Sequence, residues 1–173
     1  MIFDSRYGNT ERVAKAFEAG LKRAGVQTFV VNAKEVNPQT IQEYDLIAVG
    51  APTEKFTASE SIKEFLARLE GMHFSGKFGF AFDTRFSTRL AGSAAKYIEK
   101  KQSKLGLEII LERASAIVVS QKEKQGGIML KDSEENRLEE IGFQVGTAFL
   151  KAISLRKKEA VPAPMSIQAE VKS

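Results

Sequence analysis

A short polar turn at residues 4–10 is the first segment whose residue types could do chemistry. Ser5, Gly8, Asn9 and Thr10 place two hydroxyls, an amide and a glycine between an apolar start and a predicted helix. A helix N-terminus offers unpaired N–H groups and the positive end of the helix dipole, and hydroxyls add further donors. Gly8 lets the backbone approach an anion closely. The turn therefore favours a phosphate site; the alternative is an ordinary helix start capped by Asn9 or Thr10.

The residue types that are absent or rare exclude several other kinds of site. The chain has no cysteine, which excludes disulfides, thiolate metal sites and cysteine nucleophiles. His73 is the only histidine, so sites built from several histidines are excluded, and we expect an ordinary loop residue there. No stretch approaches the roughly 20 apolar residues of a membrane helix, and the start does not form a secretory signal. We expect a cytoplasmic protein without membrane insertion.

The charges and the end of the chain suggest one domain followed by a tail. The 173 residues carry a net charge of +4, which is too even a balance to predict a nucleic-acid ligand. Residues 154–173 hold a basic cluster and a proline segment but no apolar periodicity. We therefore expect a single domain over residues 1–153 and a basic, disordered tail over residues 154–173.

The segments that must position the polar turn alternate between strands and helices. Apolar residues at helical spacing predict helices over 10–24, 61–69, 92–105 and 133–153. Apolar runs predict buried strands over 28–31, 45–50, 77–83 and 108–120, the last broken near Glu112, and a small helix fits at 38–43. This order predicts an α/β/α sandwich with a parallel sheet. Such sheets bind ligands beyond the carboxyl ends of their strands.

The polar turn also resembles a known motif. Ser5-x-x-Gly8-Asn9-Thr10 before a helix is similar to the FMN-phosphate loop of the flavodoxin family, especially in the flavodoxin modules of flavodiiron proteins. The resemblance covers roughly residues 2–153 and implies a five-stranded parallel sheet of order 2-1-3-4-5 that holds one FMN. The family usually has a hydroxyl where this chain has Arg6 or Tyr7. The residues that would enclose the phosphate are Ser5, Arg6, Tyr7, Gly8, Asn9 and Thr10.

Two later loops resemble the family's flavin-ring loops, at residues 50–57 and 83–92. Phe56 either stacks on the ring or folds back onto the core, whereas Phe86 is expected to cover the other ring face rather than pack into the core. Arg85 and Arg89, unusual in this family, either stabilise negative charge on a reduced flavin or lie in solvent. The ring-contacting residues that the resemblance implies are Pro52, Thr53, Glu54, Phe56, Asp83, Thr84, Arg85, Phe86 and Gly92.

The resemblance implies an FMN protein that carries electrons between redox partner proteins. Two alternatives stay open: an FMN-dependent oxidoreductase for a quinone or porphyrin-type substrate, and a degenerate signalling or assembly domain without flavin. The surface is basic, whereas electron-carrying flavodoxins are usually acidic. The first strand keeps only about three residues before Ser5 instead of the usual five or six, so we expect a late start or a truncation.

Overall fold

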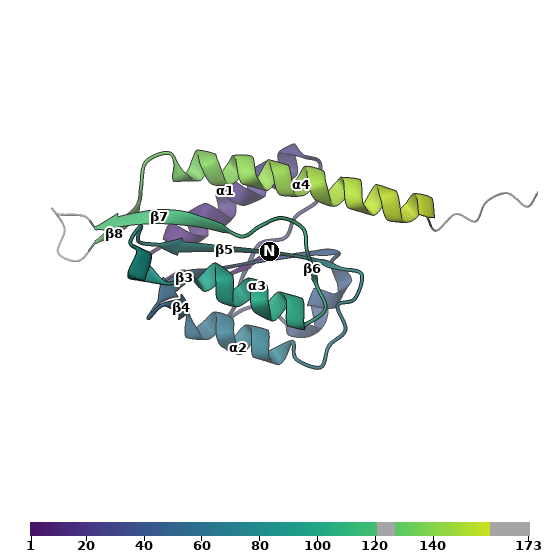
Figure 1. Ribbon diagram of the computed structural model, residues 1–173, viewed down its shortest axis with the longest axis horizontal. Helices are drawn as coiled ribbons and strands as arrows, with labels where there is room; N and C mark the ends of the chain where they lie inside the picture. Colours follow the sequence, from purple (N-terminus) through teal and green to yellow (C-terminus); the bar gives the residue numbers. More distant parts are fainter. Residues whose placement is uncertain (121–126, 160–173) are drawn as a thin grey trace, which may run out of the picture.

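The computed structural model describes residues 1–120 and 127–159, which form a sheet covered by helices on both faces. The helices α1 (Asn9–Arg23) and α4 (Glu134–Glu159) cover one face, and α2 (Glu60–Arg68) and α3 (Ala94–Lys104) cover the other (Figure 1). Two 3-10 turns, η1 (Pro38–Glu43) and η2 (Arg89–Ala91), lie in the connections. The predicted three-layer α/β/α sandwich is confirmed, and so is the small helix at 38–43.

The centre of the sheet consists of five parallel strands. In spatial order they are β2 (Val31–Asn32), β1 (Ile2–Phe3), β3 (Leu46–Glu54), β5 (Phe78–Arg85) and β7 (Ala114–Ser120). Numbered along the chain, these five follow the predicted order 2-1-3-4-5, but the described residues form eight strands in this sheet instead of the predicted five. The predicted break in residues 108–120 is also present, because β6 (Glu108–Ile109) pairs with β5 before the chain bends into β7.

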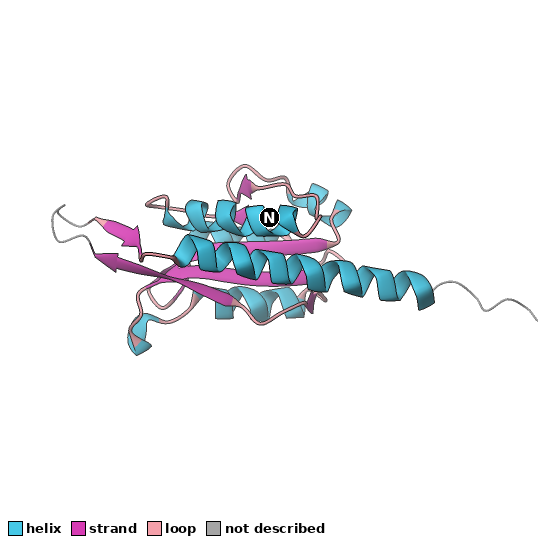
Figure 2. Ribbon diagram, turned by 90° about the horizontal axis from the view of Figure 1, so that it is seen from above, coloured by secondary structure: helices cyan, strands magenta, loops and turns pink. Residues whose placement is uncertain are grey.

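Two antiparallel additions extend this parallel centre. The strand β4 (Thr57–Ala58) folds back on β3, and β8 (Ile128–Leu130) folds back on β7. Both lie at the carboxyl end of the sheet, and Figure 2 shows the β7–β8 pair projecting from one end of the molecule while α4 extends beyond the other. The antiparallel β8 was not predicted from the sequence.

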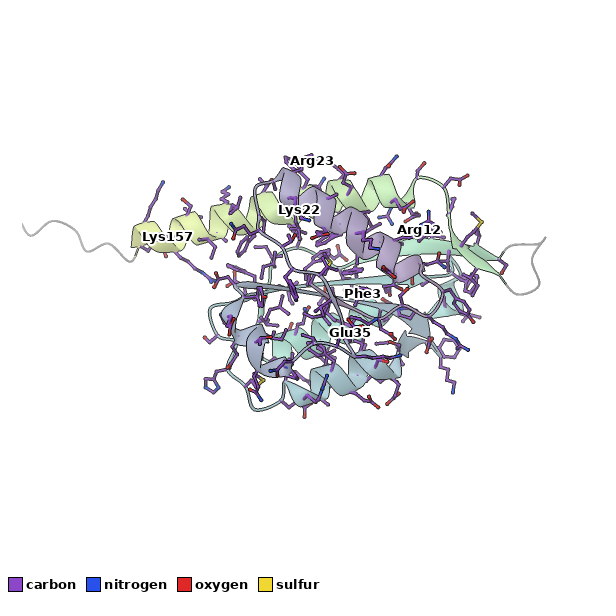
Figure 3. All side chains as sticks on the ribbon, turned by 180° about the vertical axis from the view of Figure 1, so that it is seen from behind. Phe3, Arg12, Lys22, Arg23, Glu35 and Lys157 are labelled. Atoms are coloured by element: carbon purple, nitrogen blue, oxygen red, sulfur yellow. The ribbon has the colours of Figure 1, made fainter. Side chains whose placement is uncertain are left out.

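Close contact between α1 and α4 covers one face of the sheet. A Cβ on Gly20 would lie 1.9 Å from the Glu139 carbonyl oxygen, so only glycine allows this approach. Beneath the helices, Phe17 stacks on Phe80 with ring centroids 4.9 Å apart. Arg12 and Arg23, labelled in Figure 3, reach from α1 to three carboxylates of α4: Glu135, Glu139 and Glu140. These exposed ion pairs contribute little stability, so apolar packing joins the helices.

Two predicted boundaries differ from the structure. The predicted buried strand over residues 28–31 is wrong, because β2 begins only at Val31 on the sheet edge and the side chain of Phe29 is 56% exposed. The last helix continues to Glu159 instead of ending near residue 153. The expected tail therefore begins within α4, and the remaining part of that prediction, residues 160–173, lies outside the described residues.

Candidate functional site

A cavity of about 170 Å³ opens at the carboxyl edge of the sheet, between the first turn of α1 and the ends of β3, β5 and β7. Most of the residues expected to bind the cofactor gather around it. The predicted residues that line it are Ser5, Arg6, Tyr7, Asn9, Thr10, Pro52, Thr53, Glu54, Thr84, Arg85 and Phe86. The predicted residues that do not line it are Gly8, Phe56, Asp83 and Gly92.

The turn after β1 places the N-terminus of α1 at this cavity. Gly8 has φ +79°, a left-handed conformation that other residues adopt at a cost, and it caps the helix that starts at Asn9. The Ser5 hydroxyl accepts a hydrogen bond from the N–H of Glu11 at 3.3 Å. The first N–H groups of a helix have no partner within the helix. The turn therefore holds both the Ser5 hydroxyl and unpaired backbone N–H donors of α1.

Asn9 and Thr10 tie the turn to the strands beside it. The Thr10 hydroxyl lies 2.9 Å from the Thr84 hydroxyl of β5, and both side chains are buried. The amide of Asn9 donates to the carbonyl oxygen of Ile128 in β8 at 3.0 Å. These contacts hold the start of α1 against β5 and β8. More exposed residues form the rim of the cavity.

Arg6 and Tyr7 form that exposed rim. The Arg6 guanidinium lies 5.4 Å from the centre of the Tyr7 ring and 4.0 Å from the Glu54 carboxylate. Tyr7 is 56% exposed. Arg6 thus reaches across the mouth of the cavity towards the end of β3, in contact with both solvent and the lining residues.

The second predicted loop is a tight hairpin rather than an open loop. Strand β3 continues through Pro52 to Glu54, and Lys55 and Phe56 turn the chain with φ +45° and +71°. Phe56 is 69% exposed, so the alternative that it folds back onto the core is wrong. A Cβ on Gly92 would lie 2.3 Å from the Phe56 carbonyl oxygen, so the hairpin rests directly on Gly92.

Asp83 joins the walls of the site instead of facing the cavity. Its fully buried carboxylate belongs to β5, and Oδ2 accepts hydrogen bonds from Thr53 Oγ1 at 3.1 Å, Ser93 Oγ at 2.8 Å and the Ala95 N–H at 3.0 Å. Thr53 in turn accepts from the Ala94 N–H at 2.9 Å. One carboxylate therefore links the end of β3, the end of β5 and the start of α3.

Arg85 and Phe86 form the wall contributed by β5 and the residue after it. Nη1 of Arg85 donates to the Gly92 carbonyl oxygen at 2.6 Å, while its buried Nε has no hydrogen-bond partner among the described residues. Phe86 lines the cavity and is 39% exposed, so the alternative that it packs in the core is wrong. The wall thus combines a cationic group with an accessible aromatic ring.

Two apolar residues complete the lining and were not predicted. Val118 of β7 and Ile128 of β8 also line the cavity, and Ile128 lies beside the start of α1, where Asn9 bonds its carbonyl oxygen. The apolar run at 114–120 predicted a strand. It did not predict that the carboxyl end of this strand forms a wall of the site. Three residues of β8 carry too short a pattern to predict a strand, so no local signal marks Ile128.

The donors, the apolar wall and the exposed rings fit FMN. The start of α1 supplies N–H groups and hydroxyls for a phosphate, Val118 and Ile128 give an apolar wall, and Tyr7 and Phe86 offer exposed ring faces in the lining. Arg85 adds a cationic side chain to the same lining. The described residues contain no acidic or histidine cluster that could hold a metal ion, and no helix in them is long and apolar enough to cross a membrane.

Comparisons with known proteins agree with this fit. The family model described as Flavodoxin matches residues 1–141. A flavodoxin from Clostridium saccharobutylicum is 34% identical over 85 residues, which are 49% of this chain and 53% of that protein. Flavodoxin 1 from Bacillus cereus superposes with a TM-score of 0.70 at 21% identity, covering 87% of this chain and 95% of that one.

A flavodiiron core, Flv1 from Synechocystis sp. PCC6803, has the same fold at a TM-score of 0.69 and 24% identity, covering 87% of this chain and 35% of that chain. The matched regions span about half or less of the first curated relatives' own length. The match of the family model over most of the chain, together with the fold, confirms the predicted family and FMN as its cofactor. The chain belongs to the flavodoxin family and is an FMN-binding redox protein.

Proposed function

We propose that this protein carries electrons between redox partner proteins on a single FMN held at the carboxyl edge of the sheet. The observation that carries the proposal is the cavity itself, which joins a helix N-terminus with hydroxyls to a rim of exposed aromatic rings. When bound, FMN supplies the redox chemistry, and the protein sets the cofactor's position, surroundings and access.

The phosphate end of the cofactor belongs at the turn of residues 5–10. Ser5 and Thr10 supply hydroxyls, and the first N–H groups of α1 point out of the helix end. Gly8, with its left-handed backbone, shapes the turn without lining the cavity. Arg6 adds positive charge at the same rim, although its distance of 4.0 Å from Glu54 gives it a competing partner.

The ring end belongs between the β3–β4 hairpin and the residues after β5. Ligand pockets usually measure about 300–1,000 Å³, so a cavity of about 170 Å³ encloses only part of FMN. The rest of the cofactor lies at the open rim, against Phe86 and near Phe56. Asp83 and Gly92 act by positioning these two segments, since neither lines the cavity. An exposed ring edge suits electron transfer to another protein.

Arg85 supports a second function, an FMN-dependent oxidoreductase for a quinone or porphyrin-type substrate. Arg85 lines the cavity, so an acidic or carbonyl substrate would find a cationic side chain in its wall. The same charge favours negative charge on a reduced cofactor in either function. A cytoplasmic location accompanies both proposals.

The test is the absorbance spectrum and the redox behaviour of the purified full chain. We expect a yellow protein with one FMN per chain and a reductive titration that resolves two one-electron steps. Steady turnover with NAD(P)H and a quinone, at a rate well above that of free FMN, would favour the oxidoreductase instead. A colourless protein that takes up no added FMN would overturn both functions.

A further inference from the structure

The last turns of α4 leave apolar side chains half in solvent. Leu150 and Leu155 are 40% and 51% exposed. An open groove of about 420 Å³ runs along this part of the helix, and it is lined by Leu150, Ile153, Ser154, Lys157 and Lys158. Figures 1 and 2 show α4 extending here beyond the sheet, at the end of the molecule opposite the β7–β8 pair. The groove is therefore remote from the FMN site.

The charged side chains along this groove are basic. Lys151, Lys157 and Lys158 are exposed, and none of them forms an ion pair with a described residue. Figure 3 labels Lys157 at the projecting end of α4. Residues 149–159 contain a single acidic residue, Glu159. In the first half of α4, by contrast, the carboxylates pair with arginines of α1.

Arg156 belongs to the same turns but faces the body of the protein. Its guanidinium donates to the Gly76 carbonyl oxygen at 2.5 Å and to Glu108 at 2.7 Å, and it lies 4.2 Å from the centre of the Phe78 ring. These contacts hold the end of α4 in place, so the three lysines and the apolar side chains beside them form a surface of fixed shape.

The helix dipole accounts for the lysines but not for the leucines. Cations near the C-terminus of a helix interact favourably with its last carbonyl groups. Exposed leucines gain nothing from the dipole and keep apolar area in water. Residues four apart lie on the same side of a helix, which places Ile153 beside Lys157 and Lys151 beside Leu155. Lysines and apolar side chains therefore alternate over one surface.

We propose that this surface, the basic helix end, binds anionic phospholipid headgroups at the surface of a membrane. It consists of Leu150, Lys151, Ile153, Leu155, Lys157 and Lys158. The apolar side chains enter the headgroup layer, and the long lysine stems let the ammonium groups reach the phosphates. The helix lies on the membrane and does not span it. This inference does not depend on the proposed function.

The arrangement of the side chains favours a lipid surface over a protein groove or a nucleic acid. A groove that binds a helix needs apolar anchors along one stripe, whereas Ile153 and Leu155, two residues apart, point to different sides of α4. A fluid headgroup layer accommodates both sides. Lysine is a point charge on a flexible stem and accepts many arrangements of phosphates. The leucines would gain nothing from a nucleic-acid backbone.

The experiment measures co-sedimentation of the purified full chain with lipid vesicles. Vesicles of equal parts phosphatidylglycerol and phosphatidylcholine should bind it, pure phosphatidylcholine vesicles should not, and added salt should weaken the binding. Each lysine near an anionic surface contributes about fivefold in affinity, so Lys157→Gln with Lys158→Gln should weaken binding about 25-fold. Lys34→Gln with Lys96→Gln removes two exposed lysines elsewhere and should leave binding nearly unchanged.

Leu155→Ser tests the apolar part of the contact. It should weaken vesicle binding about fivefold, with the melting temperature nearly unchanged because the side chain is half exposed. Leu90→Ser is the matched control, since Leu90 is 82% exposed at the other edge of the sheet, and it should bind vesicles as the unchanged chain does.

Equal binding to both kinds of vesicle, binding to neither, or equal losses in the two lysine pairs would overturn the proposal. Unchanged binding of Leu155→Ser would also overturn it, because the surface would then be a general patch of positive charge, open to any polyanion. FMN affinity should be the same in all of these variants, since none of the substituted residues lines the FMN cavity. A failure here therefore leaves the proposed function standing.

Discussion

At the scale of single residues, Thr10 separates phosphate recognition from ring recognition. Thr10→Val removes a hydroxyl from the turn of residues 5–10, and FMN affinity should fall about tenfold, equivalent to about 1.4 kcal/mol. Riboflavin lacks the phosphate, so its affinity should change little. The valine also leaves the Thr84 hydroxyl without its partner. Because any resulting loss of affinity is shared by FMN and riboflavin, the ratio of their affinities does not contain it.

Thr10→Ser is the matched control, because serine keeps the hydroxyl and should retain the FMN-to-riboflavin ratio. Both affinities can be measured by the quenching of flavin fluorescence. An equal loss of FMN and riboflavin binding in Thr10→Val would move the phosphate away from this turn.

Phe86 tests the position of the ring. The side chain is 39% exposed and lines the cavity, so Phe86→Ala should lower FMN affinity about tenfold by removing a stacking partner. The melting temperature of the apo protein should stay nearly unchanged. Leu150→Ala is the control, since Leu150 is 40% exposed on α4, far from the site. A loss of several kcal/mol in the apo protein with FMN affinity intact would assign Phe86 a structural role.

Asp83 shows what sequence patterns predict and what they do not at this scale. Its place after an apolar run predicts a residue at the carboxyl edge of the sheet, and the structure has it there. The resemblance implied a contact with the flavin ring. The direction of the carboxylate depends on Thr53, Ser93 and Ala95, and residues so far apart in sequence leave no local pattern that would reveal their convergence.

At the scale of elements, amphipathic helices were predictable and strand ends were not. The apolar stripe of α1 (Val13, Phe17 and Leu21) fixes that helix within one or two residues. Strand β5 continues two residues beyond its apolar run because Thr84 and Arg85 still pair with β7. Pairing with a distant strand decides such an end, so the sequence predicted loops where the structure has strand. The same cause hides β8, which exists only through its pairing with β7.

The last turn of α4 contacts the rest of the protein, whereas the sequence predicted a disordered tail from residue 154. Arg156 lies 4.2 Å from the centre of the Phe78 ring, and its guanidinium donates to the Gly76 carbonyl oxygen and to Glu108. A chain ending at Glu159 keeps these contacts and should melt within about 1 °C of the full chain. A chain ending at Ser154 loses them and should melt a few degrees lower.

Thermal unfolding of both shortened chains and the full chain measures this difference. Arg156→Gln in the full chain should reproduce most of the loss, whereas Lys157→Gln, one residue further along, should not. Equal melting of the two shortened chains would show that Arg156 contributes no stability.

At the scale of the whole molecule, the two edges of the sheet differ in how tightly side chains fill them. At the carboxyl edge, hydrogen bonds of Asp83, Thr10 and Asn9 join the segments around the FMN cavity. At the amino edge, beside Met1, a cavity of about 420 Å³ is larger than the FMN cavity of about 170 Å³. The short first strand was visible in the sequence, but this cavity follows only from the assembled layers.

The buried amine of Met1 makes the stability of the chain depend on pH. Its pKa is about 6 in the folded chain against about 8 in the unfolded chain. Between these values the unfolded chain holds a proton that the folded chain has released, so the free energy of unfolding should rise with pH from 6 to 8, by up to about 2–3 kcal/mol. Glu18, held by Lys22 and Thr28, is the charged group that acts on the amine, and Glu43 and Asp45 line the same cavity.

Urea unfolding of the full chain at pH 5.5, 7 and 8.5 measures this rise in the free energy of unfolding. A free energy of unfolding that stays constant across this range would show that the Met1 amine is as well hydrated in the folded chain as in the unfolded one.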